Sequence, residues 1–574
     1  MEMKKNSLLI FSLLYSIGSS AQKSDGNPLF SPPLDIPLSL AGNFMELRSG
    51  HFHSGLDMRT EGREGLDVKA AEDGWVSRVK VSPWGYGKAL YIEHPNGYTT
   101  VYGHLRNYAG AIAEAVLDRQ YKAREFEVDL TFEKGELPVT KGQVVAQSGN
   151  TGGSSAPHLH FEVRRTSDQH ALDPELFGMD VPDSVAPTFI GLRIDPLDSL
   201  TRVQPYPGKA RGYAAAGSGS TWSLKGAAVP SALGTIGLSV NVTDRYSNSW
   251  STCGIRSLKV SVDGRAIYSA ELDEIDFGLQ RYADAYMDYA LFKGNDMYYN
   301  RCYKLPNNKL AIYGNEAAQG RITVKPGQEL KVLVEATDAN GNRSELRFTL
   351  RGATPAQAED WNNTLTKGQY FHYDRENILT TPDARFNLPP NSLYADERIE
   401  CRTVPLPGNF APITRLHDPL TPLNLAGQLT LKADASKANG HTDKLLLVKL
   451  DDKGKPSPIG GTYADGQVSC KVKGFGDYTV MIDTLPPKVV AVDIKPNMTG
   501  RDSLKVQVTD DLSGVDQWVG KLDGEWILFE YDPKRKMITH RFDKYSSKPG
   551  KHDLVVEVRD ERGNTSTLRT SFQR

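Results

Sequence analysis

The sequence predicts a mainly β protein made of several domains. Its 574 residues are enough for about four domains of ordinary size. After about residue 183, short β-branched runs alternate with Gly, Asn, Asp and Pro turns, which is typical of small β-sandwiches. Long amphipathic helices are few in this part of the chain. We therefore expect about three β-sandwich domains, preceded by an N-terminal domain of different character.

The N-terminus has the features of an export signal. Lys4 and Lys5 precede an apolar run over residues 8–17, and small residues at 19–21 form a cleavage site. The sequence therefore predicts a signal peptide at 1–21. This run is too short to span a bilayer and no later run is long enough, so we expect no membrane span. The mature chain is expected in the periplasm, outside the cell or in the cell envelope.

Histidines are concentrated between residues 51 and 160, which hold six of the twelve in the chain. The motif HFHSGLD contains His53 and Asp57, and VYGHL contains His104. The later motif HLHFEV is strand-like, so His158 and His160 point to the same face. Imidazole and carboxylate are the usual zinc ligands, and a catalytic site keeps three of them with one open position. His53, Asp57 and one histidine of the HLH triplet would supply this set.

Other histidines and other chemistries are less well supported. His51 flanks the first motif and His94 lies in an HPNG turn, so both are interpreted as ordinary polar residues. The chain has no HExxH motif, no convincing Ser-His-Asp or Cys-His signature, and its GNTGGSS run lacks the Lys-Ser/Thr ending of a phosphate loop. A net charge of −2 gives no reason to expect nucleic acid as a partner.

Three segments carry a resemblance to a known family. HSGLD, GYGKALYIEHPNGYTTVYGHL and KGQVVAQSGNTGGSSAPHLHFEV resemble, in the same order, the lysostaphin-type (LytM-like) zinc metalloendopeptidases. The resemblance covers about residues 40 to 178 and implies an antiparallel β peptidase domain at 28–182. It also implies one zinc per chain, with His53, Asp57 and His160 as ligands. His104 and His158 are then the catalytic pair that does not bind the metal.

One segment departs from the family pattern. Residues 106–140 are longer than the usual connection, and AIAEAVLDRQYKAREF within them has helical spacing. We therefore predict a helical insertion beside the cleft, where it could restrict which substrates enter.

The resemblance implies an exported hydrolase of the bacterial cell wall. Such an enzyme cleaves peptide stems or cross-bridges of peptidoglycan with a zinc-activated water. The alternative is a non-catalytic envelope scaffold that binds and activates another wall hydrolase. A third possibility, a wall-binding or adhesion protein, leaves the metal motif unexplained. The complete ligand set favours the metalloendopeptidase, and an envelope protein partner through the β domains stays open.

The C-terminal part contains an internal repeat. VLVEATDANGNRSELRFTL (332–350) parallels LVVEVRDERGNTSTLRTSF (554–572), and DSVAP (183–187) parallels DTLPP (483–487). We therefore predict two immunoglobulin-like domains, at 186–352 and 484–574, with a linker at 353–369 and another β-rich domain at 370–483. The acidic DxxGN turns could bind calcium, although Asp and Asn are also ordinary turn residues.

Four cysteines permit three disulfide pairings. In an exported protein they indicate disulfides. We predict Cys253–Cys302 and Cys401–Cys470, because domains that fold independently seldom share a bridge across a linker.

Overall fold

The computed structural model describes residues 29–574 apart from 180, 205, 208–209 and 359–366. The predicted signal peptide at 1–21 lies outside the described residues. Strands account for 46% of the residues and helices for 9%, so the predicted mainly β class is confirmed. Within the described part, no helix combines the length and apolar character needed to cross a bilayer.

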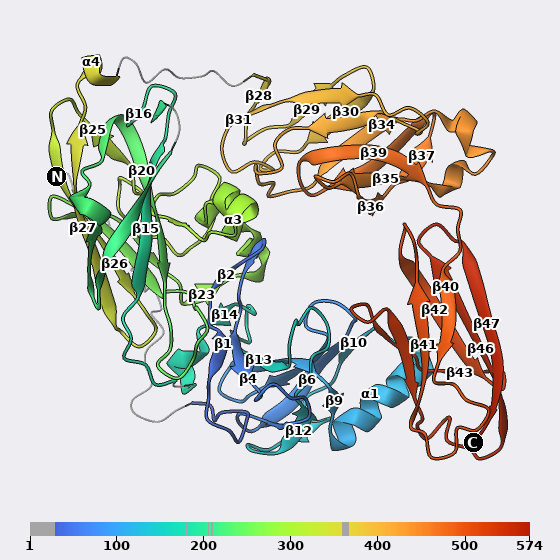
Figure 1. Cartoon of the computed structure of the whole chain (residues 1–574). Coiled ribbons are helices and arrows are strands. Elements are labelled where there is room, and N and C mark those ends of the chain that lie inside the picture. The colour runs from blue at the N-terminus through green and yellow to red at the C-terminus, as the bar shows by residue number, and fades with distance from the viewer. Residues whose placement is uncertain (1–28, 180, 205, 208–209, 359–366) are drawn as a thin grey trace, which may run out of the picture.

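The N-terminal domain is built on an antiparallel sheet (Figure 1). In β13 (His158–Arg165), Leu159, Phe161 and Val163 are fully buried in the core. Because side chains alternate along a strand, the histidines of β13 point to the other face. The strands neighbour one another in the order β1 (Leu40–Gly42), β4 (Leu56–Arg59), β13, β8 (Tyr98–Leu105), β7 (Lys88–Glu93), β6 (Gly74–Val81) and β10 (Val128–Thr131).

A helix lies in the segment expected to be an insertion. It is α1 (Gly110–Ala123), which starts shortly after β9 (Asn107–Tyr108). Ile112, Val116 and Gln120 form its buried face, and Arg124 ends it in a left-handed conformation. The chain then adds β10 and β11 (Pro138–Val139) to β6 before it enters β12 (Val144–Gln147), which pairs with β9 and with β5 (Asp67–Lys69). In Figure 1, α1 lies beside the C-terminal sandwich.

Residues 188–352 form a second β unit that is joined to the first. Short β23 (Glu274–Ile275) pairs with β14 (Ala171–Leu172), which extends the N-terminal sheet across the junction. Two helices that the sequence reading did not anticipate, α2 (Ala283–Tyr286) and α3 (Tyr289–Asn295), also lie here. The main strands are β15 (Thr188–Pro196), β18 (Arg211–Ser218), β19 (Thr221–Leu224), β20 (Ser231–Thr243), β21 (Ser257–Val262), β22 (Arg265–Glu271), β26 (Glu329–Thr337) and β27 (Arg343–Gly352), with β16 (Arg202–Val203), β17 (Tyr206–Pro207), β24 (Asn300–Arg301) and β25 (Ile322–Val324) at the margins.

Two further β units complete the chain. The first has two five-stranded sheets: β29 (Asn377–Thr380), β30 (Ala384–Leu388), β34 (Gly427–Lys432), β38 (Gln467–Val472) and β37 (Thr462–Ala464) in one, and β32 (Cys401–Val404), β33 (Ile413–Leu416), β39 (Gly476–Ile482), β35 (Leu445–Leu450) and β36 (Pro456–Gly460) in the other. The last has two four-stranded sheets: β40 (Lys488–Val492), β41 (Ser503–Thr509), β45 (Met537–Arg541) and β44 (Glu530–Asp532) in one, and β43 (Glu525–Ile527), β42 (Val515–Leu522), β46 (Lys551–Asp560) and β47 (Thr565–Gln573) in the other.

The disulfide prediction is wrong for this structure. All four cysteines are free thiols. Cys401 begins β32 and Cys470 lies in β38, and these strands belong to different sheets. The Sγ atom of Cys470 donates instead to the carbonyl of Ile459, and that of Cys302 to the carbonyl of Asn300. Assignment of cysteines to a shared domain therefore did not place their side chains against each other.

Candidate metal centre

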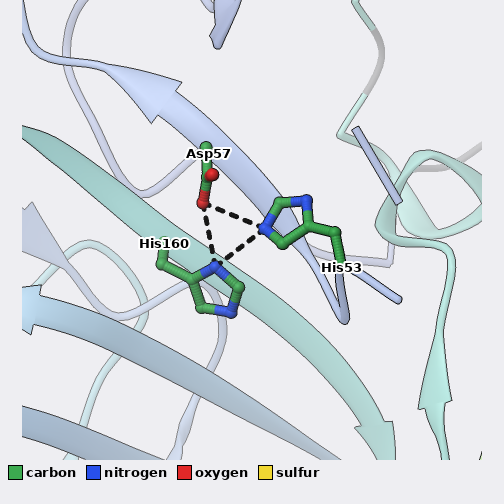
Figure 2. A group of neighbouring side chains, drawn as sticks. All are labelled: His53, Asp57 and His160. Atoms are coloured by element: carbon green, nitrogen blue, oxygen red, sulfur yellow. Dashed lines mark hydrogen bonds and ion pairs between the residues drawn. The ribbon is translucent and has the colours of Figure 1, made fainter. Parts of the chain in front are cut away.

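Three side chains converge beside the inner strands of the N-terminal sheet (Figure 2). Asp57 projects from β4 and His160 from β13, two strands that pair with these residues opposite each other. His53 lies just before β4. Its Nε2 is 3.0 Å from Asp57 Oδ1 and 3.0 Å from His160 Nδ1, and the latter two atoms are 2.9 Å apart. All three residues are at least 95% buried.

In His53 and His160, the ring nitrogen that points away from Asp57 lies against a hydrogen-bond acceptor. His53 Nδ1 is 2.7 Å from the carbonyl of Asn43, which can only accept. His160 Nε2 is 2.8 Å from the carboxylate of Glu162. These partners assign the protons to the outer nitrogens, so in the neutral rings His53 Nε2 and His160 Nδ1 present lone pairs to Asp57.

This donor set fits a zinc ion. Three lone pairs at about 3 Å repel one another unless a proton or a cation lies between them. Zinc–ligand distances of about 2.0–2.2 Å in a tetrahedron correspond to about 3.3–3.6 Å between ligands. The ligand atoms are 2.9–3.0 Å apart here, so they need to separate by only about half an ångström to hold the ion. Two imidazoles and one carboxylate are also a ligand set that catalytic zinc sites use.

The electrostatics of the cluster favour a charged Asp57. Burial opposes ionisation, but interactions with the imidazoles of His53, His158 and His160 outweigh it and hold the pKa of Asp57 well below its usual range. Burial lowers the pKa of His53 to about 4. Burial also acts to lower the pKa of His160, but the hydrogen bonds of His160 to Asp57 and Glu162 outweigh burial and raise that pKa to about 9. Without a cation, a proton on His160 thus balances the carboxylate.

Glu162 orients His160 from behind. Its carboxylate is fully buried and accepts hydrogen bonds from Ser54 Oγ at 2.6 Å and from Tyr86 at 2.5 Å. Arg164 donates to the other carboxylate oxygen at 2.6 Å. Burial raises the pKa of a carboxyl, but the Arg164 charge and these bonds lower that of Glu162. A carboxylate that accepts from a metal-binding histidine fixes the ring and increases its basicity.

Arg48 has a corresponding role at Asp57. Its Nη2 donates to Asp57 Oδ2 at 2.6 Å, which leaves Oδ1 directed at the two histidines. Glu46 is 3.6 Å from the guanidinium, and burial raises its pKa to about 7. Arg48 therefore fixes the orientation of the Asp57 carboxylate through Oδ2, and Oδ1 is left as the ligand atom that faces the two histidines.

His104 and His158 lie next to the three-residue cluster. Their ring centroids are 4.7 Å apart, and His158 Nε2 is 3.3 Å from Asp57 Oδ1. Each Nδ1 is 2.9 Å from a backbone carbonyl, that of Thr151 for His104 and that of Ala156 for His158. Each Nδ1 therefore carries a proton and each Nε2 has a free lone pair. Burial lowers the pKa of His104 to about 3, which keeps this ring neutral.

Glycines allow the loop at residues 149–157 to approach the sheet. A Cβ on Gly149 would lie 2.4 Å from the amide nitrogen of Arg106, and one on Gly152 would lie 2.3 Å from that of Gly87. The loop can therefore bring the Thr151 carbonyl to His104 only because both positions lack side chains. His104 itself has φ of 57°, a backbone conformation that is rare outside glycine.

Comparison with known proteins agrees with this geometry. Residues 51–119 and 129–174 match Peptidase family M23. The N-terminal domain is an M23 peptidase domain. Residues 368–483, for which the sequence analysis offered no family, match the Zu5-like domain.

Curated relatives match a short part of this chain. The DD-carboxypeptidase/endopeptidase Mpg of Neisseria meningitidis is 31% identical over 118 residues, 21% of either chain. The murein hydrolase activator EnvC of Escherichia coli is 29% identical over 114 residues, 20% of either chain. The chain thus spans about a fifth of the length of these relatives. The catalytic domain of lysostaphin from Staphylococcus simulans is 25% identical, with 24% of this chain and 90% of that one covered at a TM-score of 0.18.

A cleft of about 830 Å³ lies beside the M23 site. One wall is the loop at 150–157, which precedes His158, together with Lys88, Arg106 and Phe126. The other wall comes from the C-terminal sandwich, at residues 502–505 and 530–541. The Lys88 ammonium is 2.7 Å from Glu530, so an ion pair crosses the cleft. The insertion, through Phe126, and the last domain therefore both line the cleft next to the loop that precedes His158.

The C-terminal sandwich is fastened to the insertion by aromatic packing. The rings of Tyr121 and Tyr545 stack with centroids 4.0 Å apart, and Trp526 meets Tyr121 edge-on at 5.1 Å. The hydroxyl of Tyr121 also donates to Asp543 at 2.7 Å. The ring centroids of Trp518 and Phe126 are 6.2 Å apart. Both tryptophans are therefore part of a domain interface.

The structure brings all five predicted site residues together and leaves the two doubtful histidines outside. His51 is exposed, and His94 is buried in its turn, with Nδ1 at the carbonyl of Asp73. Sequence reasoning missed the supporting residues of the M23 site. Glu162 and Arg164 had a usable signal, because they continue the alternation of His158 and His160 along β13. Arg48 and Tyr86 had none, since only the fold brings them to the cluster.

Proposed function

We propose that this protein is a zinc metalloendopeptidase that hydrolyses peptide bonds of bacterial cell-wall peptidoglycan. The observation that carries the proposal is the convergence of three ligand atoms beside two imidazoles whose Nε2 atoms are free. Relatives of the M23 domain include proteins named DD-carboxypeptidase/endopeptidase and peptidoglycan DD-endopeptidase, which supports the wall as the substrate. Action on the wall places the protein in the bacterial envelope.

His53, Asp57 and His160 are proposed to hold the zinc. Bound there, zinc would supply Lewis-acid chemistry to water and to a peptide carbonyl at neutral pH. Glu162 and Arg48 keep the ligands oriented, so little reorganisation is needed when the metal binds.

His104 and His158 are proposed to handle protons and charge. Either ring can accept a proton from water at Nε2, because its Nδ1–H is engaged by a carbonyl. In its protonated form the same ring can stabilise a developing oxyanion or return the proton to the leaving amine. The backbone carbonyls of Thr151 and Ala156 hold both rings in the required orientation.

A second candidate function is a scaffold that activates another wall hydrolase. It is favoured by the relatives that are named as a murein hydrolase activator and as an NlpD/LppB homolog. The full set of ligands and free imidazoles in this chain supports catalysis instead.

Digestion of peptidoglycan separates the two functions. The zinc-loaded full chain is incubated with purified sacculi, with and without a chelator, and the released ends are identified by mass spectrometry. The proposal predicts new peptide ends that disappear with the chelator and in a His158→Ala variant. The scaffold function would be supported instead if the zinc-loaded protein releases no peptide ends, and if the parent and the His158→Ala variant both stimulate a separate wall hydrolase.

A further inference from the structure

Each of the two repeated β units contains a group of three aspartates. Asp183, Asp244 and Asp338 offer one carboxylate oxygen each, and these atoms lie within 4.8 Å of one another. The same holds for Asp483, Asp510 and Asp560. The repeat aligns the two groups position by position: DSVAP with DTLPP, VTD with VTD and DANGN with DERGN. Both groups arise from the same structural positions of one fold.

The surrounding hydrogen bonds are also repeated. Asp338 Oδ1 accepts from the amide of Asn342 at 2.8 Å, and Asp560 Oδ1 accepts from the amide of Asn564 at 2.8 Å. The side chain of each asparagine donates to the second oxygen of the same aspartate, at 2.9 and 2.8 Å. The DxxGN turn thus presents its aspartate in one fixed orientation in both units.

A second contact of this kind fixes the first aspartate of each group. The amide of Ser247 donates to Asp183 at 2.8 Å, and that of Ser513 donates to Asp483 at 2.8 Å. Four of the six carboxylates are therefore held by equivalent backbone amides or asparagine side chains. These contacts neutralise little of the negative charge.

One carboxylate oxygen in the first group has no partner. Asp244 is 3% exposed, and its Oδ1 makes no hydrogen bond to any described residue. No ion pair joins any of the six aspartates to a Lys, Arg or His within the described ranges, 29–574 with their gaps. A buried carboxylate next to two others is costly in its charged form, and either a proton or a bound cation removes that cost.

We propose that each aspartate group binds one calcium ion. The offered ligands are all carboxylate oxygens, without His or Cys, and hard oxygen donors are what Ca²⁺ selects. Ca²⁺ accepts six to eight oxygen ligands with flexible geometry, and carbonyls and water complete such a set in surface turns. The unpartnered oxygen of Asp244 is then a ligand atom. This proposal is independent of the zinc site and of the proposed peptidase activity.

The position of the groups gives the ions a structural role. Asp183 lies in the segment before β15, and Asp483 lies between β39 and β40, so each group sits where the chain enters a repeated unit. In the second unit, Arg562 of the DERGN turn donates to the carbonyls of Leu445 and Gly461 in the preceding unit, at 3.3 and 3.0 Å. A calcium ion therefore ties the entering strand to the turn that contacts the neighbouring domain, and it makes the junction rigid.

Metal counting on the full chain tests the proposal. The protein is treated with EGTA, dialysed against calcium chloride and then analysed for calcium and for zinc. Because the two metals are counted separately, loss of zinc does not change the calcium count. We expect two calcium ions per chain, falling to one in Asp244→Asn and one in Asp510→Asn. Two control variants change aspartates outside the groups and are expected to keep two ions: Asp263→Asn, at the far end of β21 from Asp338, and Asp511→Asn, next to Asp510 in the sequence. Absence of bound calcium at millimolar concentration, or two ions retained in the Asp244→Asn/Asp510→Asn double variant, would overturn the proposal.

Thermal unfolding of Asp244→Asn, with and without calcium, distinguishes a calcium ligand from an aspartate that stabilises the fold without metal. In EGTA this variant should unfold at the same or a higher temperature than the parent, because the amide keeps the shape of the carboxyl group but cannot carry a negative charge beside the other two aspartates. In calcium it should lose the stabilisation of its junction. A lower unfolding temperature in EGTA would mean that the Asp244 carboxylate has a structural role without the metal, contrary to the proposal.

Discussion

Lys534 of the C-terminal sandwich donates a hydrogen bond to the carbonyl of Ser154, with an N–O distance of 3.0 Å, although 380 positions separate the two residues. Its ammonium also donates to the carbonyl of Asn150 at 2.5 Å. Both carbonyls belong to the loop whose Thr151 holds His104 and which leads into His158. The last domain of the chain therefore contacts the segment that orients the proposed catalytic pair.

Loss of this contact should slow hydrolysis without loss of metal. In Lys534→Met the loop at 150–157 is more mobile, so His104 and His158 are less often oriented toward the His53, Asp57 and His160 cluster. We expect kcat on peptidoglycan fragments to fall several-fold while zinc content stays constant. Lys521→Met is the matched control, since Lys521 is an exposed lysine of the same sandwich and does not line the cleft. Equal kinetics for Lys534→Met and the control would show that the contact does not position the pair.

The three proposed ligands should determine zinc content. The purified protein is expected to carry about one zinc per chain, and His53→Ala, Asp57→Ala and His160→Ala should each weaken binding strongly, because each removes one of three ligands. His51→Ala is the neighbouring control, because His51 is exposed and lies outside the cluster. Metal analysis after dialysis measures the effect. Full occupancy in all three ligand variants would refute the assignment.

The two remaining histidines should affect turnover and not metal. His104→Ala and His158→Ala are expected to retain zinc and to lose about 10²–10⁴-fold in rate, the usual contribution of a general acid or base. Rates on a defined cross-linked peptide, together with zinc analysis of the same samples, measure both effects. Near-normal turnover in both variants would make these residues structural.

Glu162 should act through His160. In Glu162→Gln the shape is kept but the charge is lost, so His160 becomes less basic and Arg164 is left buried without its partner. We expect zinc affinity to fall by about 10–100-fold, as for other residues that orient metal-binding histidines. Tyr86→Phe removes one hydrogen bond to the same carboxylate but keeps its charge, and it should have a smaller effect. Competition with a fluorescent zinc chelator measures both affinities, and unchanged affinity in Glu162→Gln would exclude this role.

His94 should make stability depend on pH. Burial lowers its pKa below 6.5 in the folded protein, so the unfolded chain binds a proton that the folded one does not. Its contribution is fully present above the unfolded pKa of about 6.5 and is lost as pH falls from there, with a slope of at most about 1.4 kcal/mol per pH unit. Denaturant unfolding of the parent and of His94→Gln at about pH 7.5 and about pH 5.5 measures the difference. The parent should lose more stability than the variant, and a parallel loss in both would exclude His94 as the cause.

The local chemistry of the site was accessible from the sequence, whereas its surroundings were not. His158 and His160 share a face because a strand alternates, and that rule needs only consecutive residues. Asp57 lies opposite His160 because β4 pairs with β13. The family resemblance implied that these residues share a metal but not which strands pair. The contact of Lys534 with Ser154 depends on how whole domains pack, and no local pattern records it. The cysteines show the same limit, because compartment and domain membership do not fix the distance between two thiols.

The wall that residues 502–541 contribute to the cleft has a consequence for how the protein is made. A ribosome synthesises the M23 domain first and this wall last, and contacts between such distant segments form slowly because a long loop has to close. A newly made chain therefore has its histidine cluster before the second wall of the cleft is in place. On the proposed function, chains that end before the last sandwich would keep the metal ligands and the two neighbouring imidazoles but would lack one wall of the cleft.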